Sequence, residues 1–258
     1  MKIVKINIKT QELMKTEDLV AEETHIHVFI NKRPYATIFC TPQDLKELVA
    51  GHILSEGLIE NIGEIEKISI KENGLCNVSL KSTVNIESRL KLAQRLYRII
   101  PSACGGPYQP LALKHVKKVD SKLTVKAETI QRCIQNLNNM SETYRKTHGV
   151  HAAALFRSDE TLSAFAEDVG RHNAVDKVIG KCALKGETFN ECLLISSGRL
   201  TADIVLKAAR VGIPIVASIT ATLNSSIEIA QKANLTLIGF VRGFYMKIYN
   251  APERILFP

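Results

Sequence analysis

Residues 162–180 read LSAFAEDVGRHNAVDKVIG, and this stretch predicts a β-strand that turns directly into an α-helix. Before Gly170, apolar residues alternate with their neighbours, which is the period of a strand. After Gly170, apolar residues recur at the spacing of a helix. The alternating residues are Leu162, Ala164 and Ala166, and the helical ones are Val175, Val178, Ile179 and Cys182.

Ionisable and hydrogen-bonding side chains crowd the turn: Glu167, Asp168, Arg171, His172 and Asn173. A helix N-terminus carries about half a positive charge and free N–H groups, so Arg171 beside it makes the turn attractive to an anion such as phosphate. In a purely structural alternative, Asp168 caps the helix, Arg171 pairs with Glu167 and His172 packs. Because capping explains only Asp168, we favour a ligand site at this turn.

Strands and helices alternate through this half of the chain. Strands are predicted over residues 150–156, 192–196, 213–219 and 235–240, and helices over 128–147, 201–211 and 224–233. Strands that alternate with helices are typical of parallel sheets with right-handed crossovers. Ligands of such sheets bind beyond the carboxyl ends of the strands. At those ends this chain carries residues 168–173, 197–199, 220–222 and 242–243.

Arg171, Arg199 and Arg242 follow three of these strands, so we expect them to converge on one edge of the sheet. Guanidinium groups pair with oxyanions in a bidentate manner, and three of them suit a pyrophosphate or a nucleotide. The competing explanation for any one of the arginines is a salt bridge to a nearby acid (Glu167, Asp203 or Glu228). It explains all three together less well.

The first part of the chain predicts a smaller α+β region. Strand pairs are expected over residues 26–30 and 35–40, and over 65–70 and 75–80 around Asn73-Gly74, a strong hairpin signal. Thr41 and Pro42 are typical of a helix start, and residues 85–100 predict a basic amphipathic helix. We therefore predict an N-terminal α+β region over residues 1–125, and a C-terminal α/β domain that binds the ligand over residues 126–258.

Six cysteines are scattered along the chain without a C-x-x-C pair: Cys40, Cys76, Cys104, Cys133, Cys182 and Cys192. This spacing favours neither a disulfide scaffold nor a structural zinc site, and most of them are expected to be small buried side chains. Cys104 differs, because PSACGGPYQP (residues 101–110) predicts a mobile loop. An open thiol there suits a sulfur nucleophile or carrier, and a buried cysteine beside a tight turn is the alternative.

Charge and composition narrow the class of partner. The net charge of +8 comes from 34 basic and 26 acidic residues and suits an anionic partner. Tryptophan is absent and no basic run is interleaved with aromatic residues, so nucleic acid is disfavoured. No apolar run approaches the ~18 to 20 residues of a membrane span, and residues 1–9 resemble a strand rather than a signal peptide. We expect a cytoplasmic protein without a metal site at His25, His27 or His52.

The motif EDVGRHNAVDK (residues 167–177) resembles the formate dehydrogenase accessory sulfurtransferases, the FdhD family. The resemblance covers nearly the whole chain, and this motif is its most specific part. Further segments occur in the same order as in the family: CTPQDL (40–45), SEG (55–57), GVHAAA (149–154), SGR (197–199), VGIPI (211–215) and GFVRG (239–243).

The resemblance implies a cytoplasmic sulfur carrier that forms a homodimer. Such proteins accept sulfur from a cysteine desulfurase as a cysteine persulfide. They deliver it to the molybdenum (or tungsten) bis-guanine dinucleotide cofactor, which a formate dehydrogenase then uses. The resemblance also implies a C-terminal three-layer core with a mixed or parallel sheet, similar to the cytidine deaminase fold. GDP-like nucleotides are expected to mimic the cofactor.

Site residues follow from the matching motifs. Cys104 would carry the persulfide. The residues implied in cofactor binding are Phe240, Val241, Arg242, Gly243, Phe244 and Tyr245, with Arg171, His172 and Arg199 lining the same region. Many family members have a second cysteine three residues after the first, where this chain has Pro107. A persulfide carrier needs only one sulfur, so the mechanism does not depend on the second cysteine.

Two other functions compete with sulfur transfer. A hydrolase of the deaminase class needs H-x-E with P-C-x-x-C to hold zinc, and neither string occurs here. A nucleotide-binding chaperone module without transfer chemistry is the second. Replacing Cys104 with alanine would separate that module from a carrier.

Overall fold

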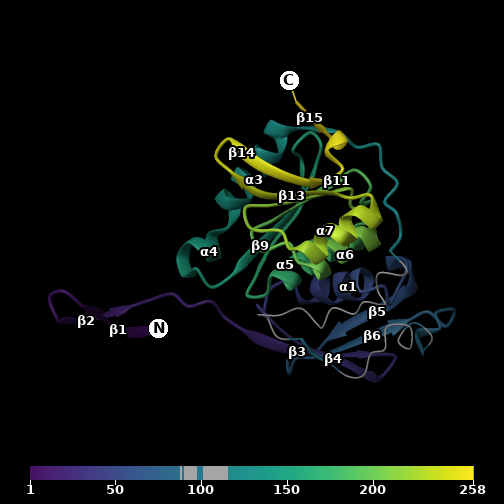
Figure 1. The fold of residues 1–258 in the computed structure, drawn as a ribbon. Helices are drawn as coiled ribbons and strands as arrows, with labels where there is room; N and C mark the ends of the chain where they lie inside the picture. The colour runs from purple at the N-terminus through teal and green to yellow at the C-terminus, as the bar shows by residue number, and fades with distance from the viewer. Residues whose placement is uncertain (88, 90–97, 101–115, 258) are drawn as a thin grey trace.

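The computed structural model describes residues 1–87, 89, 98–100 and 116–257 (Figure 1). Cys104 and its predicted loop lie outside these described residues. The described residues form a mixed α/β fold with two larger sheets and two short strand pairs.

A six-stranded sheet dominates the C-terminal half, in the order β10-β9-β11-β12-β13-β14. Its strands are β9 (His151–Arg157), β10 (Leu162–Asp168), β11 (Cys192–Ser196), β12 (Ile215–Ser218), β13 (Thr236–Arg242) and β14 (Tyr245–Asn250). β11, β12 and β13 pair in parallel, as predicted. β9 is antiparallel to both β10 and β11, and β14 is antiparallel to β13. β14 was not predicted from the sequence.

Helices cover both faces of this sheet and make three layers (Figure 1). One face carries α5 (Arg171–Leu184), α6 (Ala202–Val211) and α7 (Asn224–Ala233), and the other carries α3 (Ala127–Met140). The side chains of β9, β11, β12 and β13 alternate between the two hydrophobic clusters, as the period of a strand requires. The single helix predicted over residues 128–147 is wrong in one respect, because the chain breaks at Ser141 and α4 (Glu142–Thr147) follows.

A five-stranded sheet is formed by the N-terminal half, in the order β5-β6-β3-β4-β7. Its strands are β3 (Thr24–Ile30), β4 (Arg33–Cys40), β5 (Ile65–Ile70), β6 (Leu75–Leu80) and β7 (Arg98–Ile100). The antiparallel pairs β3–β4 and β5–β6 confirm the two predicted hairpins. The helix predicted over 85–100 is wrong at its end, because Arg98–Ile100 is a strand that pairs in parallel with β4.

Helix α1 (Leu45–Ser55) lies between the five-stranded sheet and helix α5 (Figure 1). Its N-cap is Asp44, three residues after the predicted cap at Thr41, because Thr41 is drawn into a buried hydrogen bond with Asp168 at 3.0 Å. The larger hydrophobic cluster therefore runs from both halves of the chain into this layer. The division at residue 125 stays a prediction.

Three short elements complete the C-terminal half: β8 (Val125–Lys126), η3 (Pro252–Arg254) and β15 (Ile255–Leu256). In the N-terminal half, η1 (Ile62–Glu64) precedes β5. The hairpin of β1 (Lys2–Asn7) and β2 (Glu12–Glu17) projects away from the body (Figure 1). Among the described residues, no helix is both long and apolar enough to cross a membrane.

Candidate functional site

The ends of four strands meet at one edge of the six-stranded sheet. β10 is antiparallel to β9, which is antiparallel to β11, so β10 runs in the same direction as β11, β12 and β13. We define the carboxyl edge as the residues that follow these four strands, together with the start of β9. They are residues 168–173, 197–201, 218–222 and 240–245, with His151.

Hydrogen bonds tie the loops of the carboxyl edge to one another. The Ser218 hydroxyl donates to the Gly198 carbonyl at 2.7 Å. Backbone N–H groups of Leu200 and Phe240 donate to the carbonyls of Ala221 and Thr220, both at 3.0 Å. Three of the four loops, residues 197–201, 218–222 and 240–245, are therefore held together as one surface.

Asp168 forms a buried ion pair with Lys177 instead of capping α5. Lys177 Nζ lies 2.7 Å from Asp168 Oδ2, and both side chains are fully buried. The carboxylate also accepts hydrogen bonds from the hydroxyl and N–H of Thr41, the N–H of Gly170 and the amide of Asn173. Gly170 is the N-cap residue of α5, without a side-chain cap. Asp168 and Asn173 therefore join the two halves of the chain and do not face a ligand.

Glu167 holds the start of α4. Its carboxylate accepts hydrogen bonds from the N–H groups of Thr143 at 3.0 Å and Tyr144 at 2.8 Å. A carboxylate at this position also stabilises the helix dipole. Of the five side chains that crowd the motif's turn, Arg171 and His172 are left as candidates for ligand binding.

Arg171 and Arg199 make the carboxyl edge positive near His151. Arg171 is the first residue of α5, and its side chain packs on Gly198, where an added Cβ would lie 2.8 Å from Arg171 Cβ. Arg199 is exposed. Burial, followed by the charges of both guanidinium groups, lowers the pKa of His151, so its imidazole is neutral at pH 7. The edge thus offers an anion two permanent cations and one uncharged imidazole.

His172 is buried behind the edge. Its Nε2 atom lies 3.4 Å from the Thr201 hydroxyl and 3.8 Å from Asp203 Oδ2. Burial, followed by the charge of Arg171, lowers its pKa to about 3. His172 Nδ1 and Thr222 Oγ1 are buried atoms without a hydrogen-bond partner among the described residues. Such atoms are rare in folded proteins and call for a ligand, a water molecule or an ion as their partner.

The segment from Phe240 to Tyr245 forms the far end of the carboxyl edge. Phe240 has a left-handed backbone conformation (φ 53°) at an irregularity in the pairing of β13 with β14. The guanidinium of Arg242 and the ammonium of Lys247 lie 5.6 and 4.9 Å from the centre of its ring, within range of cation–π attraction. Phe244 and Tyr245 are 95% and 83% exposed at the hairpin tip. Exposed aromatic rings beside cations suit a ligand with bases and phosphates.

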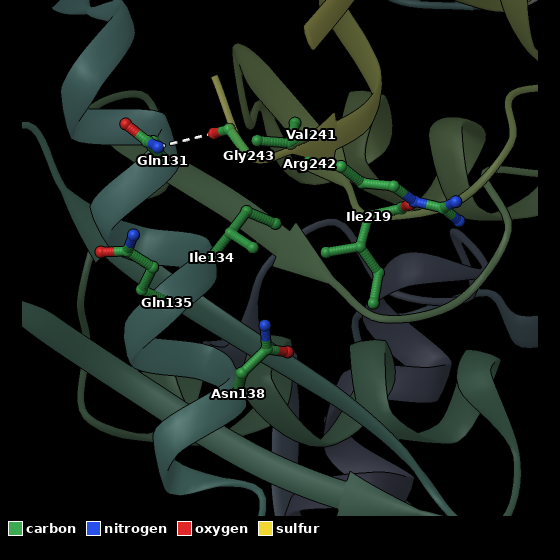
Figure 2. A pocket seen from close by; sticks show the side chains of 8 residues that line it. All are labelled: Gln131, Ile134, Gln135, Asn138, Ile219, Val241, Arg242 and Gly243. Carbon is green, nitrogen blue, oxygen red and sulfur yellow. Dashed lines mark hydrogen bonds between the residues drawn. The ribbon is translucent and has the colours of Figure 1, made fainter. Parts of the chain in front are cut away.

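A pocket of about 380 Å³ lies beside this segment, between α3 and the β13–β14 hairpin (Figure 2). We call it the α3 slot, and its lining residues are Gln131, Ile134, Gln135, Asn138, Ile219, Val241, Arg242 and Gly243. Volumes of this order are typical of small-molecule sites. Val241, Arg242 and Gly243 had been placed at the ligand by their motif. The lining residues of α3 were not predicted. Three side-chain amides at positions i, i+4 and i+7 lie on one face of a helix, and this spacing could have indicated them.

The three arginines come from adjoining parts of the carboxyl edge. Arg242 Nε donates to the Ile219 carbonyl at 2.8 Å, whereas Arg171 and Arg199 lie near His151. Their joint contact with one ligand stays a prediction.

The five described cysteines are buried and resist ionisation. Burial is the first cause that raises the pKa of each thiol, to about 11 for Cys192 and to about 12 for Cys40, Cys76, Cys133 and Cys182. The thiolate is the nucleophilic form, so none of the five suits sulfur transfer at neutral pH.

Within the described ranges, no group of three or more histidine, cysteine, aspartate or glutamate side chains is placed to hold a metal ion. His52, one of the histidines weighed as a ligand, instead lies 3.0 Å from Asp176 and 3.1 Å from the Tyr35 hydroxyl in the interior.

Comparison with known proteins assigns the family. Residues 21–256 match the FdhD/NarQ family. The chain belongs to this family. Its relatives include the "Sulfur carrier protein FdhD" of Halalkalibacterium halodurans, which is 36% identical over 98% of this chain and 94% of the relative. The protein of the same name from Saccharolobus solfataricus is 37% identical over 97% of this chain and 96% of the relative.

A solved structure agrees with this assignment. The crystal structure of a protein described as a formate dehydrogenase accessory protein, from Desulfotalea psychrophila, superposes with a TM-score of 0.81 at 30% identity. The superposition covers 99% of this chain and 98% of that one. The family resemblance of the sequence is thereby confirmed.

Proposed function

We propose that this protein is a sulfur carrier that serves a formate dehydrogenase, and that the thiol of Cys104 holds the sulfur. Family membership supports the role, because full-length relatives bear the name of sulfur carrier. The observation that supports Cys104 is the burial of the other five cysteines, whose thiol pKa values lie at about 11 to 12. Cys104 is the remaining one of the six cysteines in the sequence.

Sulfur would reach Cys104 by thiol–persulfide exchange with a cysteine desulfurase. The Cys104 thiolate attacks the outer sulfur of the desulfurase persulfide, and a new S–S bond forms as the old one breaks. The desulfurase cysteine leaves as a thiolate, so no external oxidant or reductant is needed. Cys104 then carries one additional sulfur atom.

The carboxyl edge would hold the substrate that receives this sulfur, the molybdenum (or tungsten) bis-guanine dinucleotide cofactor. Arg171 and Arg199 fit its phosphates, and the exposed rings of Phe244 and Tyr245 fit its bases. The unpartnered Nδ1 of His172 and hydroxyl of Thr222 lie in the same region and suit a polar ligand. A GDP-like nucleotide is the simplest mimic of such a substrate.

The remaining parts of the proposal come from the family resemblance. They are a homodimer, a cytoplasmic location, a cysteine desulfurase as donor and a C-terminal core similar to the cytidine deaminase fold. The three layers and the mixed sheet with a parallel centre are compatible with that last likeness.

Persulfide mapping tests the proposal. The protein is incubated with a cysteine desulfurase and cysteine, and its peptides are then analysed by mass spectrometry. We expect one added sulfur atom on Cys104, its loss in Cys104→Ala, and its retention in Cys182→Ala, a matched change at a buried cysteine of α5. Sulfur on another cysteine, or on none, would contradict the assignment.

A nucleotide-binding chaperone without transfer chemistry is the alternative, and the relatives, which bear the name of sulfur carrier, do not favour it. Formate dehydrogenase activity in cells that lack their own carrier separates the two. A carrier loses its effect in Cys104→Ala, whereas a chaperone keeps it.

A further inference from the structure

The α3 slot has apolar walls and polar ends. Ile134 comes from α3, Ile219 from the loop after β12 and Val241 from β13, so three elements enclose the apolar part. Figure 2 shows the amide of Asn138 pointing into the space between Ile134 and Ile219. A flat aromatic ring system would bury its faces on these walls and reach the amide with its edge.

The side-chain amides of Gln131 and Asn138 on α3 have different roles. Gln131 Nε2 donates to the carbonyl of Gly243 at 2.6 Å, which fixes the β13–β14 hairpin against the helix (Figure 2). The side chain of Asn138 hydrogen-bonds to no residue in the part of the chain that the structure describes, and it is exposed. Gln131 therefore supports the slot, and Asn138 is available to a ligand.

Positive charge adjoins the slot on one side. Arg242 lines it, with Nε held by the Ile219 carbonyl at 2.8 Å. Lys247 Nζ lies 4.9 Å from the centre of the Phe240 ring, which also lies under Arg242. A base in the slot would thus place its phosphates next to two cations and close to the rest of the carboxyl edge.

We propose that the α3 slot binds the purine base of a guanine nucleotide tail and that Asn138 reads its edge. The side-chain carbonyl of Asn138 can accept hydrogen bonds from N1–H and the 2-amino group of guanine, two neighbouring donors that adenine lacks. Arg242 takes the adjoining phosphate. The proposal deepens the function given above and rests on it, because that function supplies the guanine dinucleotide.

Calorimetric titration with GDP and ADP tests the slot. We expect GDP to bind the wild-type protein more tightly than ADP. Asn138→Ala should weaken GDP binding by about tenfold, the effect of one hydrogen bond that ties a ligand into its site, and should reduce the preference over ADP. Alanine favours helices, so α3 should persist, which circular dichroism checks.

Asn136→Ala is the matched control, because Asn136 is exposed on the same helix and does not line the slot. It should leave both affinities unchanged. In NMR spectra, GDP should shift the side-chain amide signal of Asn138 but not that of Asn136, which a merely structural role of Asn138 would not produce.

The outcomes separate this inference from the function on which it rests. Unchanged GDP binding and selectivity in Asn138→Ala, together with weaker binding in Arg199→Ala, would overturn the slot and leave the nucleotide site at the carboxyl edge. No GDP binding by the wild-type protein would overturn both the slot and the nucleotide part of the proposed function. Persulfide formation on Cys104 would be unaffected by either result.

Discussion

At the scale of single residues, the charged motif at residues 167–177 serves the interior more than the surface. Asp168 and Lys177 form one buried pair. Asp176 forms another with Lys207 at 2.8 Å, joined by His52 and the Ser55 hydroxyl. Burial alone would raise the pKa of Asp176, but the charges and hydrogen bonds of Lys207 and His52 together outweigh it and hold that pKa below its usual range. Breaking such a pair leaves a buried charge without compensation, which is strongly destabilising.

The lowered pKa of His172 predicts how the stability of the protein depends on pH. Its pKa is about 3 in the folded protein, against an ordinary value of 6.5, so the unfolded chain binds a proton more readily. Stability should therefore fall as the pH drops from 6.5 towards 3, by about 1.4 kcal/mol per pH unit from this histidine.

Urea unfolding of the wild type and of His172→Gln between pH 7 and pH 4.5 measures this contribution. His151 acts in the same direction because its pKa is also lowered, so the difference between the two profiles isolates His172. Parallel profiles would mean that folding does not lower the pKa of His172.

At the scale of secondary-structure elements, the contact of α1 with α5 joins the two halves of the chain. Gly51 and Gly180 let the two helix backbones touch. A Cβ added to Gly51 would lie 1.8 Å from the Asp176 carbonyl oxygen, and one added to Gly180 would lie 1.9 Å from that of Glu47. Both contacts are with backbone, which cannot move aside without separating the helices.

Gly51→Ala and Gly180→Ala should each destabilise the protein by about 3 kcal/mol or more, at the upper end of overpacking effects. Gly63→Ala is the control, because its Cβ would meet only the movable amide of Asn61, at 3.0 Å. Chemical denaturation measures all three. A decrease in the free energy of unfolding of less than about 1 kcal/mol in Gly51→Ala would show that α1 and α5 can separate with little loss of stability.

The edge strand β10 is shielded by lysines of α5. Lys181 Nζ donates to the Phe165 carbonyl at 2.8 Å, and Lys185 Nζ to the Ser163 carbonyl at 3.3 Å. Open strand edges invite pairing with other chains, and lysine is a common means of preventing it. Helix α5 therefore contributes to the carboxyl edge at its N-terminus and protects the sheet along its length.

At the scale of the whole molecule, helices α1, α5, α6 and α7 lie between two sheets, and α3 closes the far side (Figure 1). The elements that carry the carboxyl edge and the α3 slot are therefore anchored in the two hydrophobic clusters. Among the described strands, β1 and β2 pair with each other alone, so their hairpin stands apart from both larger sheets.

Removal of residues 1–20 should change the melting temperature by less than about 2 °C, because an isolated two-stranded hairpin adds little stability. Residue 21 is also where the family match begins. Scanning calorimetry of the two proteins measures the shift. A fall of more than about 5 °C would indicate that the hairpin packs on the body or on a second copy of the chain.

Much of the fold was readable from local pattern. The parallel strands β11, β12 and β13, the helices between them and the hairpin around Asn73-Gly74 were all predicted, because periodicity and turn residues depend on near neighbours. β14 was missed, since the alternation of MKIYN after the turn is weak. The start of α1 was placed at Thr41, because no local signal shows that Asp168, more than 120 residues away, takes its hydroxyl.

The sequence by itself determined the family, the parallel centre of the sheet and the position of Arg171 and Arg199 at strand ends, because these follow from spacing along the chain. Only the tertiary structure decided which polar residues of the motif are buried, that His172 lies behind the edge, and that α3 faces the β13–β14 hairpin across a slot. Those facts depend on contacts between segments far apart in sequence. Whether a polar side chain pairs with other groups in the interior or binds a substrate depends on whether folding leaves it accessible to water.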